Sequence, residues 1–323
     1  MLFTTLIPVY KTQFIEDTVQ CLKAQTLQNF QVIFSDDSPT QDLAEIIDEL
    51  QAHEGISFSY RILQGRRIGP VTNCHDLLRA WAQSSPYIHF LLDDDLIFPD
   101  FYQAHEQAYK TSDAQACISS RIVVNEKKTP VNASPLPDFL KEGNERLTLL
   151  NLEKCVHSTL PLCNNWLGEL SCATFSGVAL QNVQRNQLHE IPYYGLNDLG
   201  LILEMLGKFP VAYIQNNLGA FRLNRWQTSR DMHSKIFQST IISWVALIFD
   251  AHTKGWLSDQ QLRHGLEKAR GFIATLSESF VEHAALTASI SDLNNIESAK
   301  NSFAKAWELI LKGNTDYCTS QNI

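Results

Sequence analysis

The sequence predicts an α/β fold in which helices flank a mostly parallel sheet, followed by a helical C-terminal region. Two observations lead to this prediction. Short apolar runs alternate with segments of helical periodicity from residue 2 to about residue 214, and this alternation implies crossover connections between parallel strands. From residue 231 onward only helical patterns occur. We therefore expect an α/β domain over residues 1–230 and a helical region over residues 231–323.

The expected elements follow from hydrophobic periodicity. Strand patterns cover residues 2–7, 29–34, 56–63, 87–92, 116–124, 170–180 and 209–214. Helical patterns cover residues 12–27, 42–53, 71–83, 99–111 and 199–206, and then 235–254, 258–277 and 291–311. Residues 125–159 are polar and contain several prolines, so we expect a long irregular connection there, and such connections are often functional.

Composition narrows the class of protein. Of 323 residues, 44% are hydrophobic and 19% are charged, which is typical of a soluble globular protein. The net charge of -9 argues against nucleic acid as a partner. No apolar run is long enough for a transmembrane helix, and the N-terminal residues lack a signal-peptide pattern. The seven cysteines show no metal-ligand spacing, so we expect reduced thiols and a cytoplasmic location.

Three adjacent carboxylates end the strand pattern at residues 87–92. Asp93, Asp94 and Asp95 repel one another, and a divalent cation with its preference for oxygen ligands would relieve that repulsion. In an extended segment, Asp93 and Asp95 point to one side and Asp94 to the other. These residues alone fit either a metal and phosphate site or a solvated turn before the helix that follows Pro99.

A second acidic pair, Asp36 and Asp37, ends the strand at residues 29–34. If the strands are parallel, both acidic groups lie at the carboxyl edge of the sheet, where open α/β folds bind nucleotides. The glycine-rich dinucleotide fingerprint and the phosphate-binding P-loop are both absent from the sequence. These absences argue against an NAD enzyme and a P-loop ATPase. The alternative for Asp36 and Asp37 is local hydrogen bonding within a turn.

Several motifs occur in an order that resembles the family-2 inverting glycosyltransferases of GT-A fold. The first four are Leu6-Ile7-Pro8-Val9-Tyr10, Cys21-Leu22-Lys23-Ala24-Gln25-Thr26, Ser35-Asp36-Asp37-Ser38 and Leu91-Leu92-Asp93-Asp94-Asp95. Asn73 occupies the place of an asparagine in that family, and Asn197-Asp198 resembles the family's Glu-Asp segment. The resemblance covers about residues 2–229 and excludes the helical tail.

The resemblance implies transfer of a sugar from a nucleotide-sugar donor, expected to be a UDP-sugar, to a hydroxyl acceptor in glycan biosynthesis. The implied donor-binding residues are Pro8, Val9, Tyr10, Asp36, Asp37, Arg67, Asn73, Asp93 and Asp94. Asp95, together with Asp93, would bind Mg²⁺ or Mn²⁺, while Asp94 should tolerate substitution best. A metal would neutralise the charge of the nucleoside diphosphate that leaves.

The acceptor hydroxyl is a weak nucleophile and needs a general base, and Asp198 is the candidate. The alternative role for Asp198 is capping of the following helix. The chain departs from the family pattern at Asn197, where a glutamate is usual, and at Asn224, where a histidine is often found. His233 could replace that histidine, or Arg222 and Arg225 could bind the diphosphate.

The departures keep a second hypothesis open, a non-catalytic module that binds a nucleotide sugar or a glycan. A nucleotidyltransferase is a further alternative, although its basic glycine-rich N-terminal loop is absent. The expected acceptor is a glycan, a lipid-linked molecule or a protein. The amphipathic tail helices are expected to pack on the catalytic domain, with homodimer formation and peripheral membrane contact as the other uses of such faces.

Overall fold

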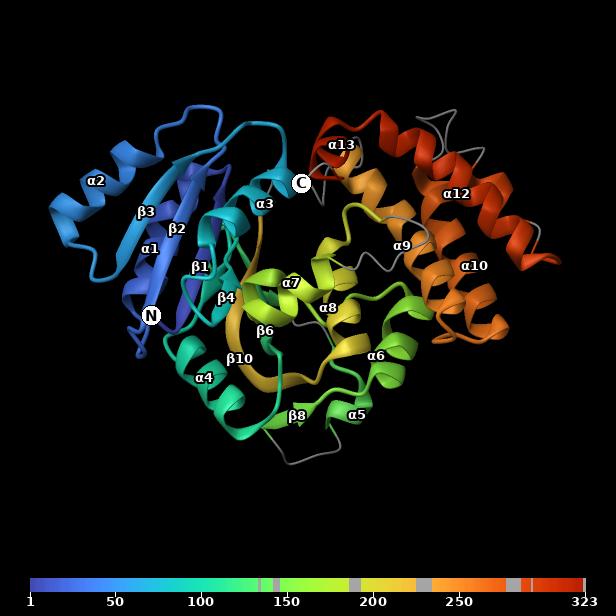
Figure 1. The fold of residues 1–323 in the computed structure, drawn as a ribbon, viewed down its shortest axis with the longest axis horizontal. Helices are drawn as coiled ribbons and strands as arrows, with labels where there is room; N and C mark the ends of the chain where they lie inside the picture. The colour runs from blue at the N-terminus through green and yellow to red at the C-terminus, as the bar shows by residue number, and fades with distance from the viewer. Residues whose placement is uncertain are drawn as a thin grey trace.

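A ten-stranded sheet crosses the protein, with helices on both of its faces (Figure 1). The computed structural model describes residues 1–132, 135–141, 146–185, 193–224, 234–276, 286–291 and 293–321. Along the main path of the sheet the strand order is β3-β2-β1-β4-β9-β6-β10-β5, while β7 pairs with β6 and β8 pairs with β10. This arrangement confirms the predicted mixed α/β class with a mostly parallel sheet.

The first half of the sheet is parallel. It contains β1 (Phe3–Val9), β2 (Phe30–Asp36), β3 (Ser59–Gln64) and β4 (Tyr87–Phe90). The crossovers are α1 (Ile15–Lys23), α2 (Leu43–Glu54) and α3 (Pro70–Trp81). A 3-10 turn at Thr12–Phe14 precedes α1. These strands therefore all end at the same edge of the sheet.

The second half of the sheet is mixed. The strands β6 (Ala116–Asn125) and β10 (Val211–Leu223) are parallel, and β9 (Ala173–Ser176) lies antiparallel between β4 and β6. Short antiparallel strands complete it: β5 (Leu96–Ile97), β7 (Pro130–Asn132) and β8 (Leu147–Leu149). Because two or three residues are too few to show periodicity, the sequence gives no sign of these short strands.

Side chains of β1 alternate between two hydrophobic clusters, one on each face of the sheet. Phe3, Ile7 and Val9 pack with α1, α2 and α4 (Phe101–Thr111), whereas Leu6 packs with α3 on the other face. This is the two-residue periodicity of a strand buried on both faces. It also fixes which residues at the strand end can face a ligand.

The helical part of the chain packs on the α3 face. Its elements are α5 (Asp138–Lys141), α6 (Leu152–Thr159), α7 (Gly177–Arg185), α8 (Asn197–Lys208), α9 (Lys235–Thr253), α10 (Asp259–Leu276), α12 (Ile296–Lys312) and α13 (Thr315–Gln321). Residues of α9, α10 and α12 share one hydrophobic cluster with α6 and α8. The last helix, α13, returns to contact α3 (Figure 1).

One predicted strand is partly wrong. Over residues 170–180 the structure has a 3-10 turn (Leu170–Cys172), then β9, and then the start of α7 at Gly177. A short apolar run does not distinguish a buried strand from a buried helix, and this segment contains both. The predicted boundary at residue 230 falls outside the described residues.

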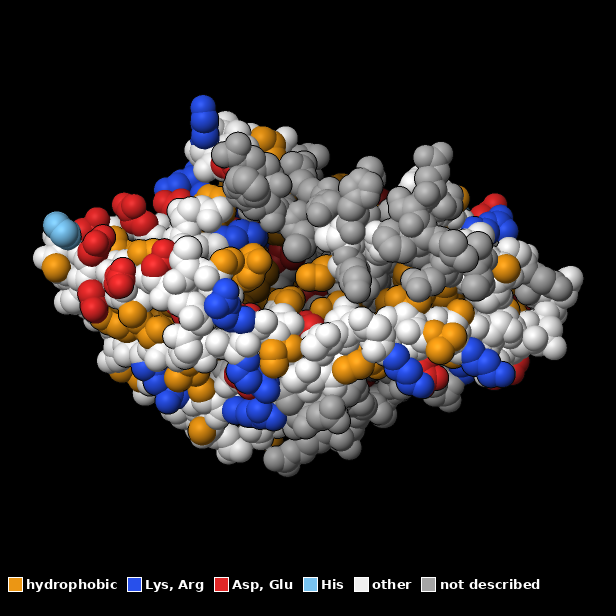
Figure 2. Space-filling view, turned by 90° about the horizontal axis from the view of Figure 1, so that it is seen from above, with side chains coloured by type: hydrophobic (Ala, Val, Ile, Leu, Met, Phe, Trp, Pro, Cys, Tyr) orange, Lys and Arg blue, Asp and Glu red, His pale blue; other side chains and the backbone are white. Residues whose placement is uncertain are grey.

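No helix in the described ranges has the length and apolar character needed to cross a membrane. On the face shown in Figure 2, the Lys and Arg side chains of the described residues stand singly or in small groups.

Candidate active site

The three aspartates lie just beyond β4, in a turn. The strand ends at Phe90, and Asp93 and Asp94 form the turn before β5 begins at Leu96. The expectation that the three side chains alternate along an extended strand is therefore wrong. Each carboxylate instead has its own environment.

Asp93 binds the loop that follows β1. The backbone N–H groups of Tyr10 and Lys11 both donate to Oδ2 of Asp93, at 2.6 and 2.5 Å. Burial and the negative charge of Asp94 raise the pKa of Asp93 to about 6. Asp93 thus connects the ends of β4 and β1.

Asp94 has the most polar surroundings of the three. Its Oδ2 forms an ion pair with Nζ of Lys11 and accepts a hydrogen bond from Nδ2 of Asn224 at 2.9 Å. Burial alone would lower the pKa of Lys11, but the carboxylates of Asp94 and Asp93 raise it. The positive charge of Lys11, from the loop after β1, therefore stands beside Asp94, and the neutral Asn224 contacts Asp94 from the end of β10.

Asp95 faces the interior. The hydroxyl of Ser171 donates to its Oδ2 at 2.7 Å, and the backbone N–H of Arg222 donates to its Oδ1 at 3.1 Å. The residue is 1% exposed, and burial together with the charge of Asp94 raises its pKa. Both carboxylate oxygens of Asp95 thus accept hydrogen bonds that hold β10 and the segment around Ser171 in place.

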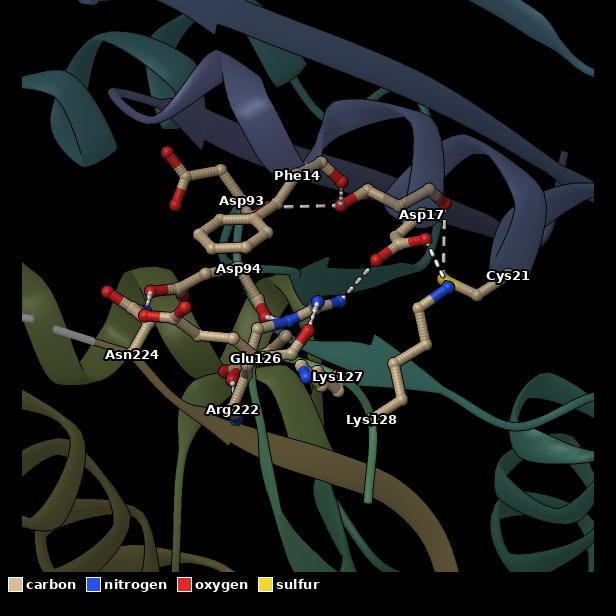
Figure 3. A network of polar contacts seen from close by, with 12 residues as sticks. Phe14, Asp17, Cys21, Asp93, Asp94, Glu126, Lys127, Lys128, Arg222 and Asn224 are labelled. Atoms are coloured by element: carbon tan, nitrogen blue, oxygen red, sulfur yellow. Dashed lines mark hydrogen bonds and ion pairs between the residues drawn. The ribbon is translucent and has the colours of Figure 1, made fainter. Parts of the chain in front are cut away.

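Arg222 holds the backbone of the aspartate turn through a hydrogen bond to Asp94 (Figure 3). Its side chain is 1% exposed, and its Nε donates to the backbone oxygen of Asp94 at 2.7 Å. It also forms an ion pair with Asp17 at 2.7 Å and lies 4.6 Å from the centre of the Phe14 ring. With its guanidinium group committed to these contacts, Arg222 does not fit the expected contact with a diphosphate. Arg225 and His233 lie outside the described residues.

A cavity of about 590 Å³ opens at this edge of the sheet. Seven of the expected donor-binding or metal-binding residues line it: Pro8, Tyr10, Asp37, Arg67, Asn73, Asp93 and Asp94. The other lining residues are Lys11, Pro39, Ile68, Gly69, Pro70, Leu92 and Ile236. The volume suits a small organic ligand, and an edge of parallel strands is where such ligands bind.

Three of the expected donor-binding or metal-binding residues do not line this cavity. Val9 is fully buried in the hydrophobic cluster that contains α1, because it follows Pro8 on a strand and points to the opposite face. Asp36 accepts hydrogen bonds from the backbone N–H groups of Ser38 and Leu43, both at 3.1 Å. Asp36 therefore shapes the turn and the start of α2, which is the local role considered for this pair. Asp95 is the third, as described above.

Asp37 and Asn73 are two further polar residues that line the cavity. Oδ1 of Asp37 accepts a hydrogen bond from the backbone N–H of Arg67 at 2.5 Å, and burial raises its pKa. Asn73 is 4% exposed, and its Oδ1 has no hydrogen-bond partner among the described residues. A buried carbonyl oxygen without a partner is costly, so a ligand N–H donor would be stabilised there.

Asp198 lies in a second polar cluster. It is in the first turn of α8, whose N-cap is Leu196, so it is not the capping residue itself. Nδ2 of Asn165 donates to Oδ2 of Asp198 at 3.0 Å, and burial raises the pKa of Asp198. Asp198 does not line the cavity described above.

Glu169 and Arg121 complete this cluster. An Nη of Arg121 lies 3.6 Å from Oε1 of Glu169, and the Glu169 side chain is 22% exposed. Burial, the charge of Asp198 and the charge of Asp94 raise the pKa of Glu169 to about 7, while Arg121 opposes the shift. Glu169 therefore lies within the electrostatic reach of both Asp198 and the turn after β4.

Sequence reasoning missed Lys11, Glu169 and Arg121. Lys11 directly follows the Pro8-Val9-Tyr10 motif, and this position after the first strand was the usable signal. Glu169 and Arg121 come from a loop and from β6, and nothing in their local sequence connects them to Asp198. Only the packing of β6 beside the residue 165–171 segment brings them together.

Comparison with known proteins finds one matching family and several solved structures with a similar fold. Residues 4–162 match the family model described as glycosyl transferase family 2. The crystal structure of S. aureus TarS residues 1–349 in complex with UDP-GlcNAc superimposes with a TM-score of 0.59 at 12% identity, covering 97% of this chain and 93% of that chain. The complex of the same fragment with UDP gives a TM-score of 0.54 at 13% identity, covering 96% and 90%. No curated protein sequence matches the chain.

The family match indicates a glycosyltransferase, and the fold is that of the GT-A class. The match over residues 4–162 identifies a domain of glycosyl transferase family 2 in that part of the chain. The family and the fold expected from the sequence are both confirmed.

Proposed function

We propose that this glycosyltransferase binds a UDP-sugar in the cavity at the sheet edge and transfers the sugar, with inversion, to a hydroxyl acceptor. The observation that carries this proposal is the cavity itself, which brings Asp37, Asn73, Asp93 and Asp94 together at the carboxyl ends of β2 and β4. The crystal structures of S. aureus TarS with UDP-GlcNAc and with UDP support a uridine nucleotide as the donor.

The donor side of the site consists of Asp37, Asn73, Asp93, Asp94 and Lys11. The half of the cavity formed by Asp37 and Asn73 would take the base, because the unpartnered Oδ1 of Asn73 needs an N–H donor. Tyr10 is 60% exposed and can stack on the base or ribose. Lys11 would contact the diphosphate through its ammonium group.

A divalent cation fits this side through Asp94 and not through Asp95. Asp94 faces the cavity and offers a carboxylate oxygen, whereas both oxygens of Asp95 are hydrogen-bonded in the interior. Among the described residues no cluster of three or more His, Cys, Asp or Glu side chains could hold a metal by itself. Asp94 and Asp93 would therefore hold Mg²⁺ or Mn²⁺ together with oxygens of the donor, and the ion would neutralise charge on the leaving diphosphate.

The acceptor side of the site consists of Asp198, Glu169 and Arg121. Asp198 would accept the proton of the acceptor hydroxyl while that oxygen forms its bond to the anomeric carbon. The bond from the anomeric carbon to the diphosphate oxygen breaks on the opposite face, which inverts the configuration. Asn165 donates to Oδ2 of Asp198 and would help to orient the carboxylate.

Release of UDP from a panel of UDP-sugars, measured with Mn²⁺, Mg²⁺ or EDTA and with candidate hydroxyl acceptors, tests the proposal. Turnover with one donor that requires a divalent cation is the expected result. Donor binding without turnover under any of these conditions would instead support a non-catalytic binding module. A β-configured product from an α-linked donor, determined by NMR, is the expected sign of inversion.

A further inference from the structure

The C-terminal end of the chain contacts the wall of the proposed donor cavity. Asp316, near the start of α13, is 5% exposed and accepts hydrogen bonds from the backbone N–H groups of Val71 and Thr72 at 3.2 and 2.9 Å. These two groups are at the N-terminus of α3, where helices leave N–H donors unpaired. A carboxylate from a distant part of the chain thus caps the helix.

Asp316 is itself held in place. The hydroxyl of Tyr194 donates to its Oδ2 at 2.6 Å. The backbone of Tyr194 is in turn fixed by Ser243 on α9, which accepts from its N–H at 2.8 Å and donates to its carbonyl oxygen at 2.7 Å. The contact between α13 and α3 therefore belongs to a hydrogen-bonded chain that continues through Tyr194 to Ser243 on α9.

The segment that Asp316 holds is the one that lines the cavity. Gly69 and Pro70 immediately precede Val71, and both are lining residues, as are Arg67 and Asn73. Gly69 has a φ of +151°, and a Cβ atom at this position would collide with the carboxyl group of Asp316. The backbone at Gly69 and the side chain of Asp316 therefore fit together closely, and any movement of α13 would be transmitted to this loop.

A second residue of the helical region reaches the same cavity. Ile236, in the first turn of α9, lines it together with residues from the ends of β1, β2 and β4. Two helices from the region after residue 231 thus act on one pocket, one by lining it and the other by capping α3.

We propose that α13 is a positioning element for the donor cavity, in which Asp316 holds the N-terminus of α3 and keeps residues 65–70 in the shape that binds the nucleotide. This inference rests on the proposed function of the cavity. It assigns the helical region a direct part in donor affinity. Asp316 acts through α3 and the loop before it, so it is a positioning residue and not a catalytic one.

The test uses the full chain and UDP as the probe, with Asp316→Ala as the main variant. Isothermal titration at a temperature where the variant is folded should show UDP affinity reduced about tenfold. A lost helix cap costs about 1 kcal/mol, and a loss of this size in binding free energy corresponds to roughly a tenfold change in affinity. The KM for the donor should rise by a similar factor, while kcat at saturating donor changes less than about twofold. Tyr194→Phe keeps the ring and removes one hydrogen bond to Asp316, so it should give a smaller loss and serves if Asp316→Ala fails to fold.

Glu308→Ala is the matched control, because Glu308 is an exposed carboxylate on α12 that forms an ion pair with Lys312 on the same helix. It should leave UDP affinity unchanged. Hydrogen exchange gives a readout that needs no ligand: Asp316→Ala should speed exchange of the amides of Val71 and Thr72, and Glu308→Ala should not. If Asp316→Ala lowers only the melting temperature and binds UDP as wild type does, the positioning role is wrong. If wild type itself binds no UDP, the donor assignment falls and this inference falls with it.

Discussion

The proposed donor side and the proposed acceptor side of the site are assembled in different ways. On the donor side, Asp37, Asp93 and Asp94 directly follow β2 and β4, so the topology of a parallel sheet is enough to bring them together. On the acceptor side, Asp198 comes from α8, Glu169 from a loop and Arg121 from β6. A site built from strand ends is a consequence of the fold class, whereas a site built from separate segments depends on how those segments pack.

The two sides also differ in their electrostatics. On the donor side the Lys11 ammonium is paired with Asp94, so negative charge there is compensated by a flexible cation. On the acceptor side the pKa of Glu169 is raised to about 7, because burial and Asp198 outweigh the Arg121 guanidinium. In the proposed function, Lys11 would compensate the charge of the phosphates on the donor side, and the raised pKa of Glu169 would favour proton exchange on the acceptor side.

The largest expected effect is on the acceptor side. Asp198→Asn should lower kcat by about 10²–10⁴-fold, the usual contribution of a general base, while UDP affinity stays near the wild-type value. Steady-state kinetics and titration of UDP check the two halves of this statement separately. A variant that loses thermal stability but keeps its kcat would show that Asp198 only supports the first turn of α8.

On the donor side, Asp94→Ala should lower kcat/KM by about 10²–10³-fold, because it removes the cavity carboxylate that pairs with Lys11 and would hold the metal. Its dependence on added Mn²⁺ should also weaken. Asp100→Ala is the matched control, since Asp100 is an exposed acid a few residues away that does not line the cavity. Equal activity of the two variants would contradict the role given to Asp94, and with it the shift of the metal site away from Asp95.

Glu169→Gln tests the electrostatic difference between the two sides through the pH dependence of the free energy of unfolding. Between about pH 4.5 and about pH 7 the unfolded chain has released the Glu169 proton and the native protein still holds it, so this group lowers the free energy of unfolding as the pH rises through that window. Glutamine cannot ionise, so Glu169→Gln avoids this loss of stability. Relative to wild type, its free energy of unfolding should be higher at pH 8 than at pH 5, by about 1–3 kcal/mol. Denaturant unfolding at the two pH values measures this difference. Glu267→Gln, on an exposed face of α10, should show no such dependence on pH.

The smallest effect is expected at the entrance of the cavity. Tyr10→Ala should raise the donor KM about three- to tenfold through loss of stacking, while Tyr10→Phe keeps the ring and should behave as wild type. The kcat of both variants should be unchanged. A KM for Tyr10→Ala equal to that of wild type would mean that the base lies elsewhere in the cavity.

Much of the site could be predicted because it follows from periodicity and strand order. The positions of Pro8, Asp37, Asn73 and Asp93 at the cavity need only parallel strands and a loop that returns to the same edge. The roles within the three aspartates could not be predicted, since the assumption of an extended strand fails where a turn begins after Phe90. In that turn Asp94 lines the cavity, whereas the two carboxylate oxygens of Asp95 accept hydrogen bonds from Ser171 and from the backbone of Arg222.

The sequence by itself determined the fold class, the family and the edge of the sheet at which the site lies, because these depend on hydrophobic periodicity and on motifs that are contiguous in the chain. Only the tertiary structure decided which aspartate faces the cavity, which carboxylate accompanies Asp198, and that Asp316 caps α3 from 245 residues away. Each of these depends on the direction of a side chain or on a contact between distant segments. Local sequence carries no signal for such contacts, since their free energy arises only when the segments are packed together.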